Sequence, residues 1–233
     1  MIGILPCAGE ASRLYGLPKY LLPVPGGYLL ERHVNAMKNS GCGTVLIGCN
    51  EGNYDMITDY SHYGLSYVAS EHATMAQTVL SSRMGASALL NDRLANETVL
   101  FGMPDTYWTD FENGYYIGDK LHTGDDIEVV LMCWQVRWKQ WQRGGMCDIE
   151  IGGRVTRIVD KPEKSESPWI WGAMRWKPSF WKWIKPEDKH VGISVQRAIE
   201  NGVHVHACVS WNGDYFDCGT SEEYFEMIRT ITA

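Results

Sequence analysis

Apolar and polar positions follow different patterns in the two halves of the chain. In the first half, short apolar runs with the length of buried strands occur at 2–6, 45–49, 65–69 and 97–101. Segments with apolar residues at helical spacing separate these runs, at 28–39, 54–63 and 74–90. Because strands separated by helices indicate β-α-β units, this half predicts a mainly parallel sheet with right-handed crossovers.

The second half predicts antiparallel strands rather than further β-α-β units. Apolar or alternating runs predict strands at 127–134, 147–151, 155–159, 169–176 and 203–209. Gly152 and Gly153 lie between two of these strands and signal a hairpin. Helices are predicted at 179–184, 191–201 and 221–229. The predicted fold class is α/β, with a Rossmann-like, mainly parallel sheet and an inserted antiparallel lobe in one domain of residues 1–233.

Composition narrows the class of protein and its partners. Hydrophobic residues make up 45% and charged residues 21% of the 233 residues, which is ordinary for a globular protein. The formal net charge of −7 argues against nucleic acid or an anionic membrane as the main partner, because both require a basic face. No apolar run reaches the ~18 residues of a membrane span. The seven Cys are scattered without a C-x-x-C pair, so we expect a reduced, cytoplasmic protein without a zinc knuckle or a disulfide framework.

The segment after the first predicted strand carries the most specific chemistry. It reads ILPCAGEASRL at 4–14 and PKYLLPV at 18–24. Small residues let backbone N–H groups approach a polyanion, and Arg13 and Lys19 can neutralise its charge, so a triphosphate is the natural ligand. The spacing matches neither the dinucleotide fingerprint nor the P-loop, which argues against a dehydrogenase and a P-loop NTPase. An acidic protein that binds a triphosphate also needs a divalent metal.

These two motifs resemble the first loop of the sugar-1-phosphate nucleotidyltransferases, or NDP-sugar pyrophosphorylases. That signature is L-A-[AG]-G-x-G-x-R-[LM] followed by P-K-x-L-[LV]-P-[VI]. Ala11 stands where the family usually has a second glycine. Within the family, the chain is similar to glucose-1-phosphate thymidylyltransferases and uridylyltransferases. The resemblance implies nucleotide-binding residues along the first half of the chain: Pro6, Ala8, Gly9, Arg13, Lys19, Gln77 and Gly102.

Two aspartates are candidate metal ligands. Asp105 follows the fourth predicted strand, and sheets of this kind bind ligands at the carboxyl ends of their strands. Spacing alone equally allows Asp105 to be a helix cap or a turn residue. Asp217 precedes Gly219 and Thr220, and Thr220 could simply cap the last helix. The resemblance implies that Asp105 and Asp217 hold Mg²⁺, which prefers one or two carboxylates together with phosphate oxygens and water.

The acceptor side is predicted from the second half. Lys161, in Asp160-Lys161-Pro162, resembles the family's E-K-P element, whose Lys contacts the acceptor phosphate; the alternative is an exposed turn lysine. Trp171 and Gly172 resemble the family's strand beside the sugar, with Gly172 allowing close approach of the ligand. The Trp-rich region around 134–183 would also suit a lobe core or a subunit contact, and the latter would make the protein a homo-oligomer.

The base reader is the least specific of these predictions. Gln77 resembles the residue with which the family reads the base, but it also lies where a helix begins after Thr74. One acceptor and one donor on a Gln suit a pyrimidine, so UTP or dTTP is favoured.

Together these features imply a Mg²⁺-dependent nucleotidyltransferase that joins NMP from an NTP to a sugar-1-phosphate and releases pyrophosphate. Arg13, Lys19, Asp105 and Lys161 are the implied catalytic residues. Residues of about 1–125 would form the nucleotide-binding part, and about 126–233 the sugar-binding substrate lobe and the rest of the core. The alternatives are a cytidylyltransferase for an alcohol phosphate or a sugar acid, and a non-catalytic nucleotide-sugar binding protein.

Overall fold

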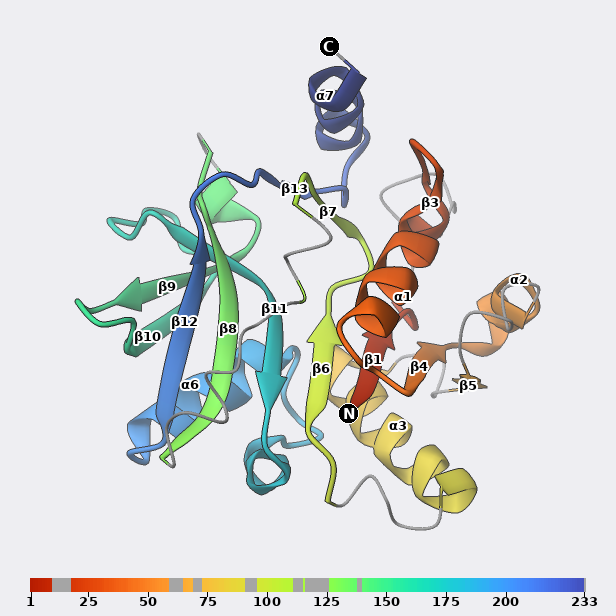
Figure 1. Cartoon of the computed structure of the whole chain (residues 1–233), viewed down its shortest axis with the longest axis horizontal. Helices are drawn as coiled ribbons and strands as arrows, with labels where there is room; N and C mark the ends of the chain where they lie inside the picture. The colour runs from red at the N-terminus through yellow and green to blue at the C-terminus, as the bar shows by residue number, and fades with distance from the viewer. Residues whose placement is uncertain are drawn as a thin grey trace.

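The computed structural model describes residues 1–9, 18–58, 65–68, 73–90, 96–110, 115, 126–137 and 140–232. Figure 1 shows the arrangement of its helices and strands, with the 3₁₀ helices denoted η in the text. The first half contains β1 (Ile2–Pro6), η2 (Lys19–Leu21), β2 (Pro23–Val24), β3 (Gly27–Tyr28), α1 (Leu29–Asn39), β4 (Thr44–Cys49), η3 (Glu51–Asn53), α2 (Tyr54–Thr58), β5 (Leu65–Val68), α3 (Met75–Leu90), β6 (Val99–Gly102) and β7 (Thr106–Trp108). The second half contains β8 (Ile127–Gln135), η6 (Gln140–Gln142), β9 (Gly145–Ile149), β10 (Val155–Asp160), β11 (Trp169–Trp176), η7 (Pro178–Trp183), α6 (Val191–Glu200), β12 (His204–Ser210), β13 (Tyr215–Asp217) and α7 (Ser221–Thr232).

One large sheet joins the two halves. Strands β5, β4, β1 and β6 pair in this order and in parallel. Strand β11 then pairs antiparallel with β6, and β8 and the β9–β10 hairpin extend the sheet from β11. Strand β12 completes it, parallel to β8. The predicted α/β class, a mainly parallel sheet with antiparallel strands added, is confirmed.

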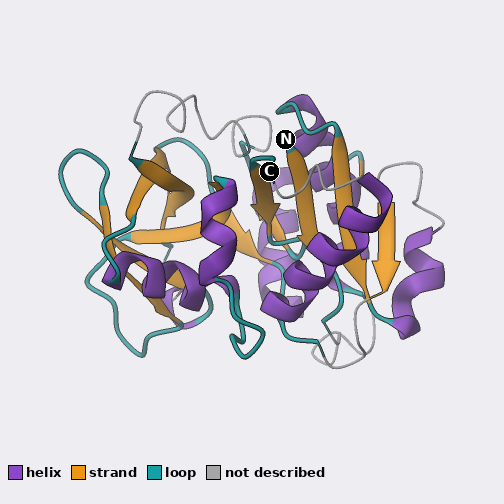
Figure 2. Ribbon diagram, turned by 90° about the horizontal axis from the view of Figure 1, so that it is seen from below, coloured by secondary structure: helices purple, strands orange, loops and turns teal. Residues whose placement is uncertain are grey.

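Both faces of the parallel part are buried. Leu5 and Ile47 belong to the same apolar cluster as α1 residues such as Val34, whereas Ile4 and Leu46 cluster with Val79 of α3. Successive strand residues therefore pack against opposite sides of the sheet. Figure 2 shows helices on both sides of this part of the sheet. This double burial explains why the sequence has continuous apolar runs at these strands. It also holds the carboxyl ends of β1 and β6 side by side.

Most predicted elements are present, with differences at short or irregular ones. Gly152 and Gly153 have φ of +97° and +89°, as the predicted hairpin requires. The helix predicted at 179–184 is instead the 3₁₀ helix η7, with proline in its first turn. The strands of two or three residues, β2, β3, β7 and β13, were not predicted. Of the helix predicted at 54–63, the part beyond Thr58 lies outside the described residues.

The tryptophans of the second half lie mostly in the core. Trp134, Trp171, Trp176 and Trp181 are each at most 3% exposed. Trp134 stacks on Trp108 with ring centroids 4.6 Å apart. The lobe-core interpretation of these four residues is therefore confirmed, whereas Trp138 lies outside the described residues. Trp211 is 74% exposed and contacts Trp169 edge to face.

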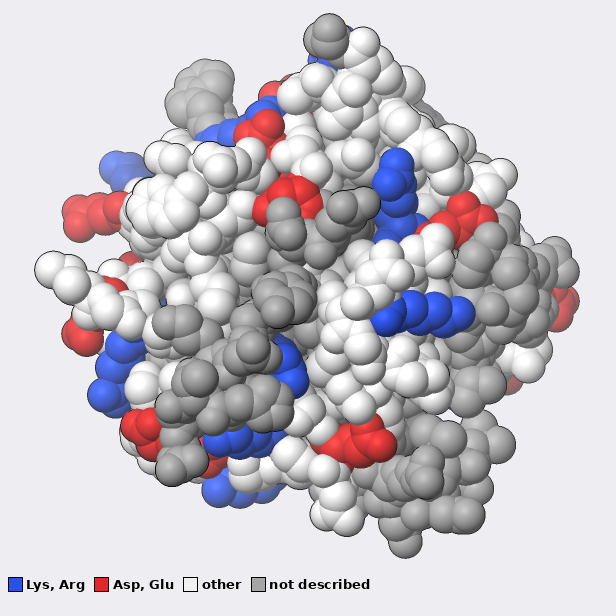
Figure 3. Space-filling model, in the orientation of Figure 1, with Lys and Arg blue, Asp and Glu red and all other residues white. Residues whose placement is uncertain are grey.

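Charged side chains of both signs lie on the face drawn in Figure 3, where the described Lys and Arg side chains are interspersed with Asp and Glu. Within the described ranges, no helix has both the length and the apolarity needed to cross a bilayer.

A buried ion pair fixes helix α6 to the segment that precedes it. Asp188 is 3% exposed and accepts hydrogen bonds from Arg197 Nη1 at 2.8 Å and from Ser194 Oγ at 2.7 Å. Arg197 Nη1 also donates to the carbonyl of Trp183 at 2.7 Å. These hydrogen bonds to Asp188 hold the N-terminus of α6, which faces the site described below.

We expect Arg197→Met to reduce the free energy of unfolding by about 3 kcal/mol, because it leaves the Asp188 carboxylate buried without its cation. The matched control is Arg229→Met, which removes an exposed arginine from α7 and should change stability by less than about 0.5 kcal/mol. Urea denaturation followed by tryptophan fluorescence measures both. Equal effects of the two substitutions would contradict the assignment.

Candidate active site

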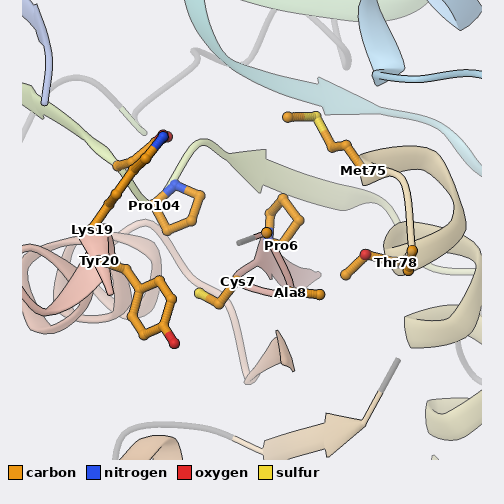
Figure 4. Close-up of a pocket in the computed structure, with 11 residues that line it drawn as sticks. Pro6, Cys7, Ala8, Lys19, Tyr20, Met75, Thr78 and Pro104 are labelled. Carbon is orange, nitrogen blue, oxygen red and sulfur yellow. The ribbon is translucent and has the colours of Figure 1, made fainter. Parts of the chain in front are cut away.

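A cavity opens at the carboxyl end of β1. Its lining includes Pro6, Ala8, Gly9, Lys19, Met75 and Asp105. Figure 4 shows the end of β1 facing Met75 and Thr78 of α3, with Lys19 and Pro104 on the other side. Four of the predicted nucleotide-binding residues, Pro6, Ala8, Gly9 and Lys19, are therefore brought together. Arg13 and Ala11 lie outside the described residues.

Two asparagines after β4 hold the start of the loop that follows β1. Asn53 Nδ2 donates to the carbonyl of Cys7 and Asn50 Nδ2 to that of Ala8, both at 2.9 Å. Asn50 and Asn53 also bond each other's backbone N–H groups. With these carbonyls engaged, the backbone of Cys7 and Ala8 is held at the edge of the cavity. Sequence analysis did not identify Asn50 and Asn53; the available signal was Asn-x-x-Asn directly after a strand.

The two candidate metal ligands are neighbours across the small sheet formed by β7 and β13. Asp217 pairs with Thr106, the residue after Asp105. The backbone N–H of Cys218 donates to the carbonyl of Asp105 at 2.9 Å. Lys19 Nζ lies 3.4 Å from Asp105 Oδ2. The geometry thus brings Lys19, Asp105 and Asp217 together, as the sequence predicts.

The electrostatics of this group suit a bound cation. Burial and the nearby charge of Asp105 raise the pKa of Asp217 well above its ordinary value, against the opposing effects of the Gly219 N–H and of Lys19. Two carboxylates that repel each other offer oxygen ligands of the kind that hard divalent cations prefer. Among the described residues, no group of three or more His, Cys, Asp and Glu forms a larger ligand cluster. The donor set therefore fits Mg²⁺ held by two carboxylates, with the remaining ligands from substrate and water.

A second cavity adjoins the first on the side of β11 and α6. Its lining includes Lys161, Trp171, Asp217, Arg143 and His190. Three residues line both cavities: Lys19, Met75 and Asp105. The two cavities therefore meet at the Lys19–Asp105 pair. The predicted acceptor residue Lys161 is on the opposite side of that pair from the end of β1.

Lys161 has an unusual backbone conformation. Its φ is +45°, in the left-handed region, and it is the only described non-glycine residue with a positive φ. The following residue is Pro162, which further restricts the backbone of Lys161. Its N–H donates to the carbonyl of Gly144 at 3.0 Å, which holds the strained residue against the start of β9. Strained residues of this kind cluster at ligand-binding sites, which favours a functional role for this side chain over a simple turn lysine.

Arg143 and His190 are site residues that sequence analysis did not find. Arg143 Nη1 lies 2.9 Å from Glu223 Oε2 and donates to Thr220 Oγ1 at 3.2 Å. Burial and the charge of Asp217 raise the pKa of Glu223 to about 7, against the effect of Arg143. His190 Nε2 lies 3.2 Å from Asp160 Oδ2, next to Lys161. Their partners are remote in sequence, so no local motif marks either residue.

Three predicted ligand residues have structural partners of their own. Gln77 Oε1 accepts from the N–H of Thr74 at 2.8 Å, and Thr74 Oγ1 from the N–H of Gln77 at 3.2 Å, which is a helix capping box. A Cβ on Gly172 would lie 2.6 Å from Tyr215, and one on Gly102 would lie 1.7 Å from the Tyr115 hydroxyl. These glycines therefore make room for aromatic residues. Trp171 does line the second cavity, at 2% exposure.

The turn that carries Asp105 rests on a buried histidine of α1. His33 is fully buried; its Nε2 is 2.8 Å from the carbonyl oxygen of Thr106, and its Nδ1 is 2.7 Å from the Tyr115 hydroxyl. Burial lowers the pKa of His33 to about 4, against the effects of the Thr106 carbonyl and Asp105. The imidazole is therefore neutral at pH 7.

Comparison with known proteins gives a family-model match in the first half of the chain and solved structures of similar fold for the whole chain. Residues 3–113 match the family model of the MobA-like NTP transferase domain. A sequence search of curated proteins gave no match. A UDP-glucose pyrophosphorylase complexed with UDP-glucose has a similar structure, with a TM-score of 0.77 at 15% identity over 99% of this chain and 98% of that chain.

Two further solved structures are similar over nearly their whole length. A putative glucose-1-phosphate thymidylyltransferase from Bacillus anthracis has a TM-score of 0.76 at 18% identity, over 99% of this chain and 95% of that one. The inositol-1-phosphate CTP transferase from T. maritima has a TM-score of 0.75 at 13% identity, over 99% and 96%. The resemblance predicted from the first loop is confirmed by the family model and by this fold.

We expect the buried His33 to make stability fall as the pH is lowered from 6.5 to 4. In this window the unfolded chain binds a proton at this imidazole while the folded protein does not, so protonation favours unfolding. The full difference between the pKa of this imidazole in the unfolded chain and in the folded protein corresponds to about 3 kcal/mol in the free energy of unfolding. Urea denaturation at several pH values, compared between wild type and His33→Gln, measures it.

The wild type should lose more stability than His33→Gln on acidification, which separates this histidine from other groups that titrate in the same range. Parallel pH profiles for wild type and His33→Gln would disprove the neutral, buried histidine.

Proposed function

We propose that this chain transfers a nucleotidyl group from an NTP to a phosphorylated acceptor, because residues 3–113 match the model of an NTP transferase domain and the fold is similar to that of solved nucleotidyltransferases. The observation that carries the proposal is the meeting of two cavities at Lys19 and Asp105. The cavity at the end of β1 would hold the NTP, and the cavity beside Lys161 would hold the acceptor. The α-phosphate would then lie between them.

The proposed reaction is an in-line displacement at the α-phosphorus. An oxygen of the acceptor phosphate forms a bond to this phosphorus while the bond to the β-phosphate oxygen breaks, and pyrophosphate leaves. The nucleophile is already an anion at neutral pH, so no strong general base is required. Catalysis then depends mainly on positioning and on neutralisation of charge.

Each predicted side chain has a role in this scheme. Lys19, 3.4 Å from Asp105, would contact triphosphate oxygens and the leaving pyrophosphate, together with Arg13. Lys161 would hold the attacking phosphate from the acceptor side. The left-handed backbone conformation of Lys161 supports this role, because strained residues of this kind cluster at ligand-binding sites. Arg143, which lines the same cavity, would add a second cation on this side.

Asp105 and Asp217 would hold Mg²⁺. When bound, the ion would neutralise charge on the phosphate oxygens and help to orient them. Asp105 directly precedes β7 and Asp217 ends β13, so their separation is set by the pairing of these strands. Lys19 would limit the repulsion between the carboxylates before the ion binds.

For the substrates, we favour UTP or dTTP and a sugar-1-phosphate. Two of the similar structures support this choice, since their names refer to UDP-glucose and glucose-1-phosphate. The second candidate is CTP with an alcohol phosphate, supported by the similar inositol-1-phosphate CTP transferase and by the engagement of Gln77 in the helix cap. A non-catalytic nucleotide-sugar binding protein would bind the same ligands without releasing pyrophosphate.

We expect pyrophosphate release in the presence of Mg²⁺ to depend on one NTP and one phosphorylated acceptor. The assay screens five nucleoside triphosphates against a panel of sugar-1-phosphates and alcohol phosphates. Asp105→Asn, Lys19→Ala and Arg13→Ala should each lower turnover by about 10²-fold or more, because each removes charge stabilisation at the transferred phosphate. Asp148→Asn, on the exposed side of β9, is the matched control for Asp105→Asn.

Wild-type rates in all three variants would rule out the assigned site. Nucleotide binding without turnover across the whole panel would favour the non-catalytic alternative.

We expect Lys161→Ala to weaken binding of the acceptor far more than binding of the NTP. The KM for the acceptor should rise by about 10-fold or more, because one charged contact to phosphate is lost, while the KM for the NTP stays within about twofold. Lys164→Ala, three residues further along and exposed, is the matched control. Steady-state kinetics with each substrate varied in turn separates the two constants. A rise in the KM for the NTP alone would place Lys161 on the donor side.

A further inference from the structure

We propose that His33 is a positioning residue for Asp105, acting with Tyr115 through the backbone of the turn between β6 and β7. This inference rests on the proposed role of Asp105 as a ligand of Mg²⁺. His33 belongs to α1, far in sequence from this turn, and it lies outside the two motifs that resemble the first loop of the family. Its link to the site is therefore visible only in the fold.

The hydrogen bonds of His33 reach the residue directly after Asp105. Nε2 is 2.8 Å from the carbonyl oxygen of Thr106, and Nδ1 is 2.7 Å from the Tyr115 hydroxyl. A carbonyl oxygen only accepts, so Nε2 carries the hydrogen and donates it to Thr106. In a neutral imidazole Nδ1 then accepts, and the Tyr115 hydroxyl donates to it. One tautomer satisfies both contacts.

Tyr115 braces the other end of the same turn. A Cβ on Gly102 would lie 1.7 Å from the Tyr115 hydroxyl, so this hydroxyl packs against the last residue of β6. The rings of His33 and Tyr115 also pack, with centroids 5.8 Å apart, and His33 meets Trp108 edge to face at 5.2 Å. The segment from Gly102 to Thr106 is thus held at both ends by one pair of buried polar side chains.

The second half of the site holds Asp105 from the opposite direction. The N–H of Cys218 donates to the carbonyl of Asp105 at 2.9 Å, and Cys218 directly follows Asp217. The separation of the two carboxylates therefore depends on two supports: β13 on one side, and His33 on the other. Removing the His33 support leaves the Thr106 carbonyl without this donor and lets the turn shift toward β13. Loss of comparable outer contacts to metal ligands typically costs 10–100-fold in metal affinity or activity.

The experiment compares His33→Leu, His33→Gln and Tyr115→Phe with wild type. Leu has no donor for the Thr106 carbonyl, whereas the amide nitrogen of Gln can replace Nε2. Val205→Ala, which creates a cavity at a fully buried residue of β12, is the control for general loss of stability. Three quantities are measured: binding of Mn²⁺ to the free protein by electron paramagnetic resonance, hydrogen–deuterium exchange of a peptide covering 99–110, and the Mg²⁺ concentration that gives half-maximal pyrophosphate release.

In His33→Leu, we expect Mn²⁺ binding to weaken and the half-maximal Mg²⁺ concentration to rise, each by about 10–100-fold, with faster exchange in 99–110. His33→Gln should restore all three to within about threefold of wild type, and Tyr115→Phe should lie between these two variants. Val205→Ala should leave metal binding and exchange in 99–110 unchanged.

Equal effects of His33→Leu and Val205→Ala on metal binding and on exchange in 99–110 would show that His33 acts only as a core residue, and would overturn the proposal. Failure of His33→Gln to restore metal binding would also overturn it. If His33→Leu does not fold, wild-type Mn²⁺ binding in Tyr115→Phe would overturn it. A wild-type protein that binds Mn²⁺ but releases no pyrophosphate would refute the proposed function, while the binding and exchange measurements would still decide the role of His33.

Discussion

The pairing of two three-residue strands, β7 and β13, is the contact on which the candidate site depends. It places Asp217 opposite Thr106, and the Cys218 N–H bonds the Asp105 carbonyl. Asp105 lies near the middle of the chain and Asp217 near its C-terminal end, and the two paired strands beside them carry the buried aromatic residues Trp108 and Tyr215. The apolar contacts of those aromatic residues offset the cost of bringing two carboxylates together. Charge repulsion is thus built into the resting protein, and a bound cation would relieve it.

The continuous apolar runs and the order of elements made the large sheet predictable, because both faces of its parallel part are buried. Lys19, Asp105, Lys161 and Asp217 were also predicted, since each lies in a motif that resembles one of the family. Strands β7 and β13 were missed because three residues show no periodicity. Arg143, His190 and Asn53 were missed because their partners are remote, and only the folded chain brings each pair together.

Gln77 and Gly172 show the opposite limit of sequence reasoning. Each matches a family pattern, yet each also has a partner within the fold. Gln77 forms a capping box with Thr74, and the absence of a side chain at Gly172 makes room for Tyr215 and Trp134. A motif reports that a residue type is needed at a position, but it does not separate a contact with ligand from a contact with the fold. A functional role is better supported for Lys161, because its left-handed backbone conformation costs free energy. Turn geometry alone does not explain that cost.

The two cavities belong to different parts of one continuous sheet. The first lies at the ends of parallel strands, and the second beside antiparallel β11, which pairs directly with β6. The backbone N–H of Met75, at the start of α3, also donates to the carbonyl of Lys189 at 3.3 Å, next to His190. The two cavities are therefore joined by a sheet and a helix terminus rather than by a flexible linker. In the proposed reaction, whose rate depends on the placement of two anionic phosphates, such a fixed separation would supply much of the catalysis before any side chain takes part in the chemistry.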